Sequence, residues 1–198
     1  MKRDDKMQEE RIISELKKGN LVIMPTDTVY GIVADATKEE TIKKVFEAKE
    51  RSFNKPLLVL VSDRKMLEKV VSEISPKTEE IISKYWPGPL TILFPKKEKV
   101  SDILTASSPY IAVRMPNDER LLNIIRKVSR PLIATSANIT SKAAITEVSQ
   151  IEDKMQQKIS YILDGGVVKN EASTIIKIEN DKIEMLRAGS LADKLEKE

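Results

Sequence analysis

Residues 20–31, NLVIMPTDTVYG, place hydroxyl and carboxylate groups directly after a short apolar run. The apolar run stops at Pro25, and Thr26, Asp27, Thr28 and Tyr30 follow within five positions. In open α/β folds, polar side chains at the end of a strand commonly face a ligand at the edge of the sheet. We therefore expect a strand at residues 21–24 whose exit opens a binding site.

Three cations lie close together in the sequence AKERSFNKPL: Lys49, Arg51 and Lys55 fall within seven residues. Such a cluster can hold a phosphate or a carboxylate, because both side-chain types bind these anions through charged hydrogen bonds. Lysines near the end of a helix also complement the helix dipole. Both interpretations stay open from this segment alone.

Arg114 interrupts the apolar run of IAVRMP just before Pro116. A buried arginine needs a partner, and either a carboxylate of the protein or an anionic ligand would serve. In PLIATSAN, Ser136 and Asn138 follow a second apolar run, where they would cap a helix or bind a nucleotide. Arg187 follows the last expected strand, and by itself indicates only a solvated charge.

Composition excludes several kinds of chemistry. The chain of 198 residues has neither cysteine nor histidine, which removes disulfides, thiolate metal sites and the usual general base. Its formal charge of +3, from 34 basic and 31 acidic side chains, is too balanced to indicate a nucleic-acid binder, although a local basic cleft remains open. No apolar run reaches membrane-spanning length and residues 1–11 lack the apolar centre of a signal peptide. We expect one cytoplasmic domain covering residues 1–198.

Helix-like and strand-like segments alternate along the chain, which predicts an α/β fold. The hairpin at its end makes the expected sheet mixed. Thr37 and Glu40 have the spacing of a capping box, Ser75 with Pro76 marks another helix start, and Gly19 ends the first helix. Helices are expected at residues 5–18, from Thr37 to about 49, 76–86, 118–127 and 147–156, and strands at 21–24, 57–61, 90–94, 111–115, 132–135, 161–163, 173–178 and 182–186.

The motifs taken together resemble the YrdC-type L-threonylcarbamoyladenylate synthases over nearly the whole chain. The resemblance rests on PTDTVYG at 25–31, the lysine-x-arginine of Lys49 and Arg51, WPGPLT at 86–91, VRMP at 113–116, TSAN at 135–138, and DGG at 164–166 followed by Ser173-Thr174. It implies an open, twisted mixed sheet flanked by helices, with a concave basic cleft. It also implies synthesis of threonylcarbamoyl-AMP and pyrophosphate from L-threonine, bicarbonate and ATP, supplying the tRNA threonylcarbamoyl-transfer machinery.

The resemblance also implies roles for individual residues. Lys49 and Arg51 would be catalytic, with Lys49 adding charge near the phosphates, and Thr28, Arg114 and Ser173 would bind threonine. A magnesium ion bridging the phosphates is expected, without a dedicated cage of protein carboxylates. The residues implied for ATP are Arg51, Lys55, Tyr110, Ser136, Asn138, Thr146 and Arg187.

Two other functions stay open at this stage. A non-catalytic RNA- or tRNA-binding protein could use the same fold and line a phosphate track with Lys49, Arg51, Lys55 and Arg114. A nucleotide-binding regulatory subunit would bind ATP without threonine-dependent turnover. The synthase itself requires no protein nucleophile, because the threonine amine attacks bicarbonate and the carbamate attacks the α-phosphate, so a chain without histidine or cysteine suits it.

Overall fold

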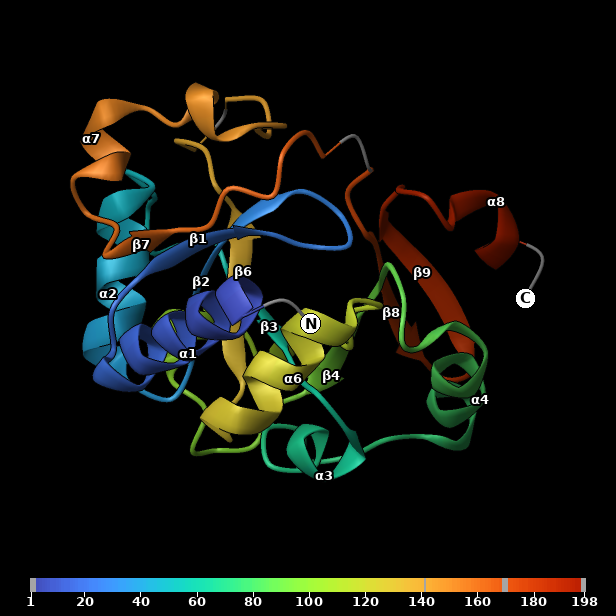
Figure 1. Cartoon of the computed structure of the whole chain (residues 1–198). Coiled ribbons are helices and arrows are strands. Elements are labelled where there is room, and N and C mark those ends of the chain that lie inside the picture. Colours follow the sequence, from blue (N-terminus) through green and yellow to red (C-terminus); the bar gives the residue numbers. More distant parts are fainter. Residues whose placement is uncertain (1–2, 141, 169–170, 197–198) are drawn as a thin grey trace.

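The computed structural model describes residues 3–140, 142–168 and 171–196 and contains a nine-stranded sheet (Figure 1). The strand order is β7-β1-β2-β6-β3-β5-β4-β8-β9, with both parallel and antiparallel neighbours, so the mixed α/β prediction is confirmed. The strands are β1 (Val22–Pro25), β2 (Tyr30–Asp35), β3 (Leu58–Leu60), β4 (Leu90–Pro95), β5 (Tyr110–Arg114), β6 (Leu132–Ser136), β7 (Tyr161–Ile162), β8 (Thr174–Glu179) and β9 (Lys182–Arg187).

The opening polar segment is the turn of a hairpin, which differs from the expected strand exit. β1 and β2 pair antiparallel, with Pro25 opposite Tyr30, and the chain between them turns through residues 26–29. Strand β2 was not expected, because the polar residues before it were interpreted as the start of a loop. All six of its residues are buried.

The longer helices begin and end close to the predicted positions. Ser75 caps α4 by accepting a hydrogen bond from the Thr78 amide, and Asp118 caps α6 through the Leu121 amide. Gly19 follows α1 with a φ of +81°, the left-handed conformation that favours glycine. The helices of eight or more residues are α1 (Arg3–Lys18), α2 (Glu39–Ala48), α4 (Pro76–Tyr85) and α6 (Glu119–Val128).

Two local predictions are wrong. The expected helix at residues 147–156 is a 3-10 turn (Val148–Gln150) followed by the short α7 (Asp153–Gln156). The capping box at Thr37 does not form, since the Thr37 hydroxyl donates to the buried Asp35 carboxylate at 2.6 Å and Lys38 takes the cap position. Three further short helices were not expected: α3 (Arg64–Leu67), α5 (Asp102–Thr105) and α8 (Ala192–Leu195).

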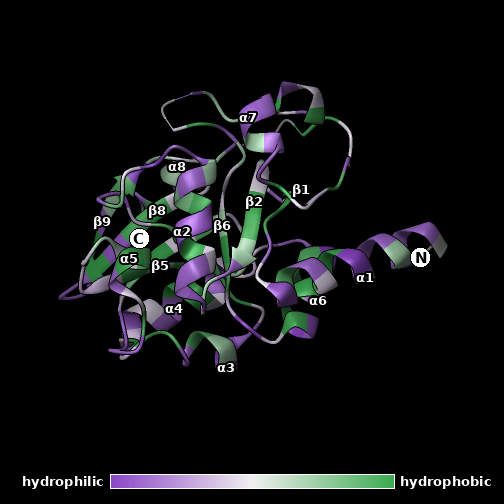
Figure 2. Cartoon of the chain, turned by 90° about the vertical axis from the view of Figure 1, so that its left-hand side faces the viewer, coloured by the Kyte–Doolittle hydropathy of each residue, from purple (hydrophilic) through white to green (hydrophobic). Residues whose placement is uncertain are grey.

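Apolar helix faces and the sheet form the core. Helices α1 and α6 lie side by side, and Figure 2 shows them on one side of β2 and β6 with α2 on the other. The strands are the most hydrophobic part of this view, and helix surfaces turned outward are polar. Within the described ranges, no helix has both the length and the apolar character required to cross a bilayer.

The last two strands form the predicted hairpin. β8 and β9 pair antiparallel from Glu179 and Lys182 at the turn to Ile175 and Arg187 at the open end. Asn180 and Asp181 have φ values of 50° and 60°, as a tight turn with two left-handed residues requires. The hairpin lies at one edge of the sheet, and its open end brings Arg187 back to the start of β8.

Candidate functional site

Sheet register divides most of the predicted site residues into two groups. Ser136 lies opposite Gly31 at the end of β6, whereas Arg114 lies opposite Leu60, which pairs with Leu132 at the start of β6. Arg114 lies at the end of β5, next to Val113, which pairs with Ile92 of β4, and Leu90 at the start of β4 pairs with Thr174, the residue after Ser173. Tyr110 and Arg114 are four positions apart in this extended strand, a span of about 13 Å. Tyr110, Ala112 and Arg114 point to the same face, because side chains alternate along a strand.

Arg114 is 2% exposed and forms an ion pair with Asp27 from the β1–β2 turn. Its Nη1 lies 2.7 Å from both carboxylate oxygens of Asp27, and the Asn117 amide donates to the same carboxylate at 2.9 Å. The Nε of Arg114 is buried and, among the described residues, has no hydrogen-bond partner. The sequence left open whether a protein carboxylate or an anionic ligand would pair with Arg114. The protein carboxylate of Asp27 is present, and the buried Nε remains unsatisfied.

Ser173 and Arg187 are joined at the start of β8. Arg187 donates through Nε and Nη2 to the Ser173 carbonyl, at 3.0 and 2.7 Å, and through Nη2 to the Ser173 hydroxyl at 3.0 Å. The hydroxyl also lies 2.9 Å from Thr91 Oγ1. Although Arg187 lies at the surface, desolvation and then the positive charge of Arg114 lower its pKa. It is therefore bound to Ser173 instead of being a freely solvated charge, and it belongs spatially with the residues predicted for threonine.

Lys49 lies at the end of α2 and contacts the loop that follows β6. Its Nζ donates to the carbonyls of Ser136 and Asn138, the latter at 2.8 Å, and to Asn138 Oδ1 at 3.2 Å. Burial, and then the positive charge of Arg51, lower the pKa of Lys49 to about 7. The side chain therefore binds this loop and does not complement the dipole of its own helix. Ser136 and Asn138 also bind each other, and neither caps a helix.

Arg51 organises the segment between α2 and β3. It donates through Nε to the Lys55 carbonyl at 3.1 Å and through Nη2 to the Pro56 carbonyl at 2.8 Å. Burial lowers the pKa of its guanidinium. Lys55 is exposed at the end of this segment, and Phe53 between them is 51% exposed, with its ring 4.7 Å from that of Phe46.

The remaining predicted residues have different surroundings. Thr28 is buried in the β1–β2 turn, 3.0 Å from Thr26 through their hydroxyls. The Tyr110 hydroxyl donates to Glu179 at 3.1 Å, and Lys177 Nζ lies over the Tyr110 ring, 4.4 Å from its centre. The Tyr110 hydroxyl is therefore bound next to the β8–β9 turn. Thr146 lies beyond the Ser136–Asn138 loop and donates through its amide to Gln150 at 2.8 Å.

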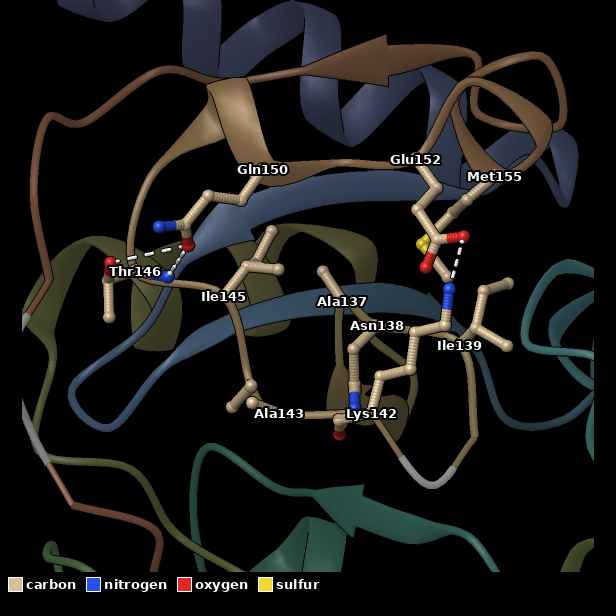
Figure 3. Close-up of a pocket in the computed structure, with 11 residues that line it drawn as sticks. Ala137, Asn138, Ile139, Lys142, Ala143, Ile145, Thr146, Gln150, Glu152 and Met155 are labelled. Carbon is tan, nitrogen blue, oxygen red and sulfur yellow. Dashed lines mark hydrogen bonds and ion pairs between the residues drawn. The ribbon is translucent and has the colours of Figure 1, made fainter.

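A hollow of about 370 Å³ borders the loop after β6 (Figure 3). Asn138 and Thr146 contribute to its lining, with Lys142 and Glu152 paired at 2.8 Å on its rim. A larger cavity of about 840 Å³ lies elsewhere and includes Val59 and Ile111, which point to the opposite face of the sheet from Arg114. The smaller hollow is the one that adjoins the predicted nucleotide residues.

Tyr30 fixes the DGG segment, a role that sequence reasoning missed. Its hydroxyl donates to the Gly166 carbonyl at 2.7 Å and accepts from the Gly165 amide at 2.9 Å. A Cβ at Gly165 would lie 2.5 Å from Pro25 Cγ, so this close approach requires glycine. Tyr30 stood out in the sequence as part of PTDTVYG, but its hydrogen-bond partner Gly165 lies 135 residues away, so the sequence did not indicate this contact.

The cations of the site share an arrangement that differs from that of the surface cations. Lys49, Arg51 and Arg187 donate to neutral carbonyl, amide or hydroxyl oxygens, and no ion pair within the described ranges includes them. Surface cations such as Arg126 pair with carboxylates, in that case Glu119 at 2.7 Å. The described residues contain no cluster of three or more carboxylates that could hold a metal ion. The site therefore offers fixed positive charge and hydrogen-bond donors.

An open mixed α/β sheet with such cations defines a class of proteins whose sites suit anionic ligands. The chain belongs to the Sua5/YciO/YrdC family, described as telomere recombination, which matches residues 14–189. It is 42% identical over 177 residues to a putative threonylcarbamoyl-AMP synthase of Methanocaldococcus jannaschii, covering 88% of this chain and 82% of that relative. It is 37% identical to a threonylcarbamoyl-AMP synthase of Pyrococcus abyssi, covering 89% of this chain and 52% of that relative.

Solved structures agree with this membership. P. abyssi Sua5 complexed with L-threonine has a TM-score of 0.90 and 36% identity, covering 96% of this chain and 56% of that one. Escherichia coli YciO, with a TM-score of 0.82 and 16% identity, supports the fold alone and covers 94% of this chain and 90% of that one. The chain therefore spans little more than half the length of the P. abyssi protein.

Proposed function

We propose that this protein is a threonylcarbamoyl-AMP synthase that uses L-threonine, bicarbonate and ATP. The observation that carries the proposal is the threonine end of the site, where the positive charge of buried Arg114 contributes to lowering the pKa of Arg187, and Arg187 binds Ser173. The likeness to a Sua5 structure complexed with L-threonine supports the same assignment. The RNA-binding and regulatory alternatives have no comparable observation in their favour.

In this proposal, Arg114, Ser173 and Thr28 bind the threonine. Asp27 occupies Nη1 of Arg114 and Nε is enclosed by the protein, so Nη2 is the guanidinium nitrogen that would bind the threonine carboxylate. An arginine edge that binds a carboxylate gains both geometric specificity and a charged hydrogen bond. The Ser173 hydroxyl, already fixed by Thr91 and Arg187, supplies a further polar contact.

The opposite end of the site binds ATP. Arg51 and Lys55 hold the phosphates, Ser136 and Asn138 contact the nucleotide from their loop, and the 370 Å³ hollow beyond them receives the base. Thr146 lines that hollow. Arg187 extends the positive charge toward the threonine end, where it binds Ser173, and Tyr110 lies at the start of β5, at the other end of that strand from Arg114.

The reaction needs positioned charge more than it needs a protein nucleophile. The threonine amine attacks bicarbonate, water leaves, and the resulting carbamate oxygen attacks the α-phosphate of ATP with departure of pyrophosphate. Negative charge grows on the phosphate oxygens during the second step, and Arg51 and Lys55 would stabilise it. Holding both substrates in one site also removes much of the entropic cost of bringing them together.

The proposal includes a magnesium ion carried by the ATP phosphates. The site supplies hydroxyl, amide and cationic groups, a set that leaves the metal to phosphate oxygens and water, as Mg²⁺ commonly prefers. When bound, the ion would offset phosphate charge. The product would pass to the machinery that modifies tRNA in the cytoplasm, with tRNA itself as a possible contact, and residues 1–198 would act as one domain.

The test measures product formation by the purified chain. With ATP, magnesium, bicarbonate and L-threonine, we expect pyrophosphate and a mass matching threonylcarbamoyl-AMP, both lost when threonine or bicarbonate is omitted. Arg51→Ala removes a charged contact worth about 1.5–3 kcal/mol, so kcat/KM for ATP should fall about 10- to 150-fold. Arg126→Ala, a surface arginine paired with Glu119, is the matched control and should retain activity.

Two outcomes would overturn the proposal. ATP binding without threonine-dependent product would indicate a regulatory subunit. Absence of ATP binding together with RNA binding that weakens steeply with salt would indicate an RNA-binding protein.

A further inference from the structure

The side chain of Lys49 is fully engaged by one loop. It is 2% exposed, and Nζ donates to the Ser136 carbonyl, the Asn138 carbonyl and Asn138 Oδ1. A lysine ammonium has three N–H donors and no acceptor, so these three oxygens use its full capacity. A phosphate could reach Nζ only by displacing one of these oxygens.

The backbone of Lys49 binds the far end of the same loop. Its carbonyl accepts a hydrogen bond from the Thr140 amide at 3.0 Å and another from the Thr140 hydroxyl at 3.1 Å. Residues 136–140 are thus attached to a single residue at both ends. Because α2 and its C-cap belong to the packed fold, this attachment fixes the loop to a rigid element.

The cost of burying this charge is not balanced by a carboxylate. Its described partners are neutral oxygens, which stabilise a cation less than an ion pair does. The pKa lowered to about 7 reflects that cost, with burial as its main cause. If this position had only a structural role, an apolar residue would fill it at a lower cost in folding free energy. A function at the loop is therefore the simplest reason for a buried lysine here.

We propose that Lys49 is a positioning residue for ATP, which holds Ser136 and Asn138 in their binding arrangement and does not itself contact the phosphates. This inference rests on the proposed function, because it assumes that the 136–140 loop binds the nucleotide. It assigns Lys49 a different role from the phosphate charge that the family resemblance implies. The positive charge that Lys49 adds to the loop acts on the nucleotide through the Ser136 and Asn138 oxygens that it polarises.

The first experiment compares amide hydrogen exchange in ligand-free protein. In Lys49→Met, the Asn138 amide should exchange faster than in the wild type, because the loop loses its attachment to the ammonium while the apolar side chain still fills the space and the carbonyl of residue 49 still binds Thr140. A direct phosphate ligand would leave ligand-free exchange unchanged. Lys43→Met is the matched control, since Lys43 lies on the same helix, is 48% exposed and pairs with Glu39.

The second experiment separates the two substrates. Lys49→Met should raise the KM for ATP at least tenfold and leave the KM for threonine within about twofold, because Arg114 and Ser173 belong to other elements. An equal rise in both values would contradict the proposal. So would unchanged ATP affinity in a variant whose loop exchanges faster.

Chemical rescue tests the ammonium itself. The chain has no cysteine, so Lys49→Cys introduces a single alkylation site. Alkylation of the unfolded variant with 2-bromoethylamine, followed by refolding, restores an ammonium at nearly the original reach, and 1-bromopropane gives an uncharged side chain of equal length. Recovery of ATP affinity and slow loop exchange only with the ammonium supports the proposal, and recovery with both contradicts it.

A milder variant covers the case in which Lys49 variants do not fold. Thr140→Val removes one hydrogen bond to the Lys49 carbonyl and leaves Nζ untouched. We expect about a two- to tenfold loss of ATP affinity, the scale of one neutral hydrogen bond, with threonine affinity unchanged. No loss would contradict positioning through this loop. Failure of the wild type to bind ATP would instead contradict the proposed function, while the ligand-free exchange result would still stand.

Discussion

The ion pair between Arg114 and Asp27 should contribute strongly to stability, and Asp27→Asn tests this. The substitution keeps the shape of the side chain and removes its charge. Nη1 of Arg114 donates to both carboxylate oxygens and the Asn117 amide donates to one of them. An asparagine amide nitrogen must therefore face at least one N–H donor, whichever way it is turned, and the buried guanidinium keeps an uncompensated charge.

The expected magnitude follows from burial. The side chains of Arg114 and Asp27 are 2% and 9% exposed, and removing one partner from a buried pair costs about 3–5 kcal/mol. In the better of its two orientations the amide oxygen keeps the hydrogen bonds from Nη1 and the Asn117 amide, so we take the lower value of about 3 kcal/mol. For a chain of this length, each kcal/mol lowers Tm by about 2–4 °C, which gives a decrease of about 6–12 °C.

The assay is thermal unfolding followed by circular dichroism at neutral pH, with Glu119→Gln as the control. Glu119 pairs with Arg126 at a similar distance, 2.7 Å, but both side chains are exposed, and such pairs contribute about 1 kcal/mol or less. Its Tm should fall by no more than about 4 °C. If the Tm of Asp27→Asn also falls by no more than about 4 °C, the reasoning from burial is refuted.

Two further predictions concern Tyr30 and Lys49. Tyr30→Phe should destabilise the protein by about 1–3 kcal/mol and speed exchange of the Gly165 amide, because that N–H and the Gly166 carbonyl lose their partner; unchanged exchange would contradict this. Since the pKa of Lys49 is lowered to about 7, the unfolded chain binds a proton that the folded chain has released, so the free energy of unfolding should rise between pH 7 and 10. Denaturant titrations should show a smaller rise in Lys49→Met, and equal rises would show that Lys49 is not the titrating group.

Local signals in the sequence were sufficient for much of the fold. Ser75 acts within three residues of its own position, so the helix start that it predicts is confirmed. The capping box predicted at Thr37 does not form because the Thr37 hydroxyl donates to a nearer acceptor, the carboxylate of Asp35. Asp35 is fully buried and forms an ion pair with Arg130 at 2.7 Å. No spacing rule shows that Asp35 would be buried there.

The site was less predictable than the fold because its contacts join distant segments. The sequence correctly indicated that Arg114 would be buried and would need a partner, but its partner, Asp27, lies 87 residues away. The contacts of Lys49 with Ser136 and Asn138 span 87 and 89 residues. Residue type identified these side chains as chemically important, and only the tertiary structure shows which oxygen each cation binds.

The distribution of paired and unpaired cations matches the charges of the two proposed substrates. Arg51 binds neutral oxygens, so the end assigned to ATP keeps its positive charge for a polyanion, and Lys49 adds to that charge below its pKa of about 7. Arg114 is compensated by Asp27, so the unpaired positive charge at the end assigned to threonine comes from Arg187, which suits the single carboxylate of an amino acid. Carbonyl dipoles that hold a cation in place leave its charge available to a ligand, whereas a carboxylate would cancel it. Asp27→Asn should therefore disturb the balance at the threonine end alone, since none of the groups fixing Lys49 or Arg51 contacts that pair.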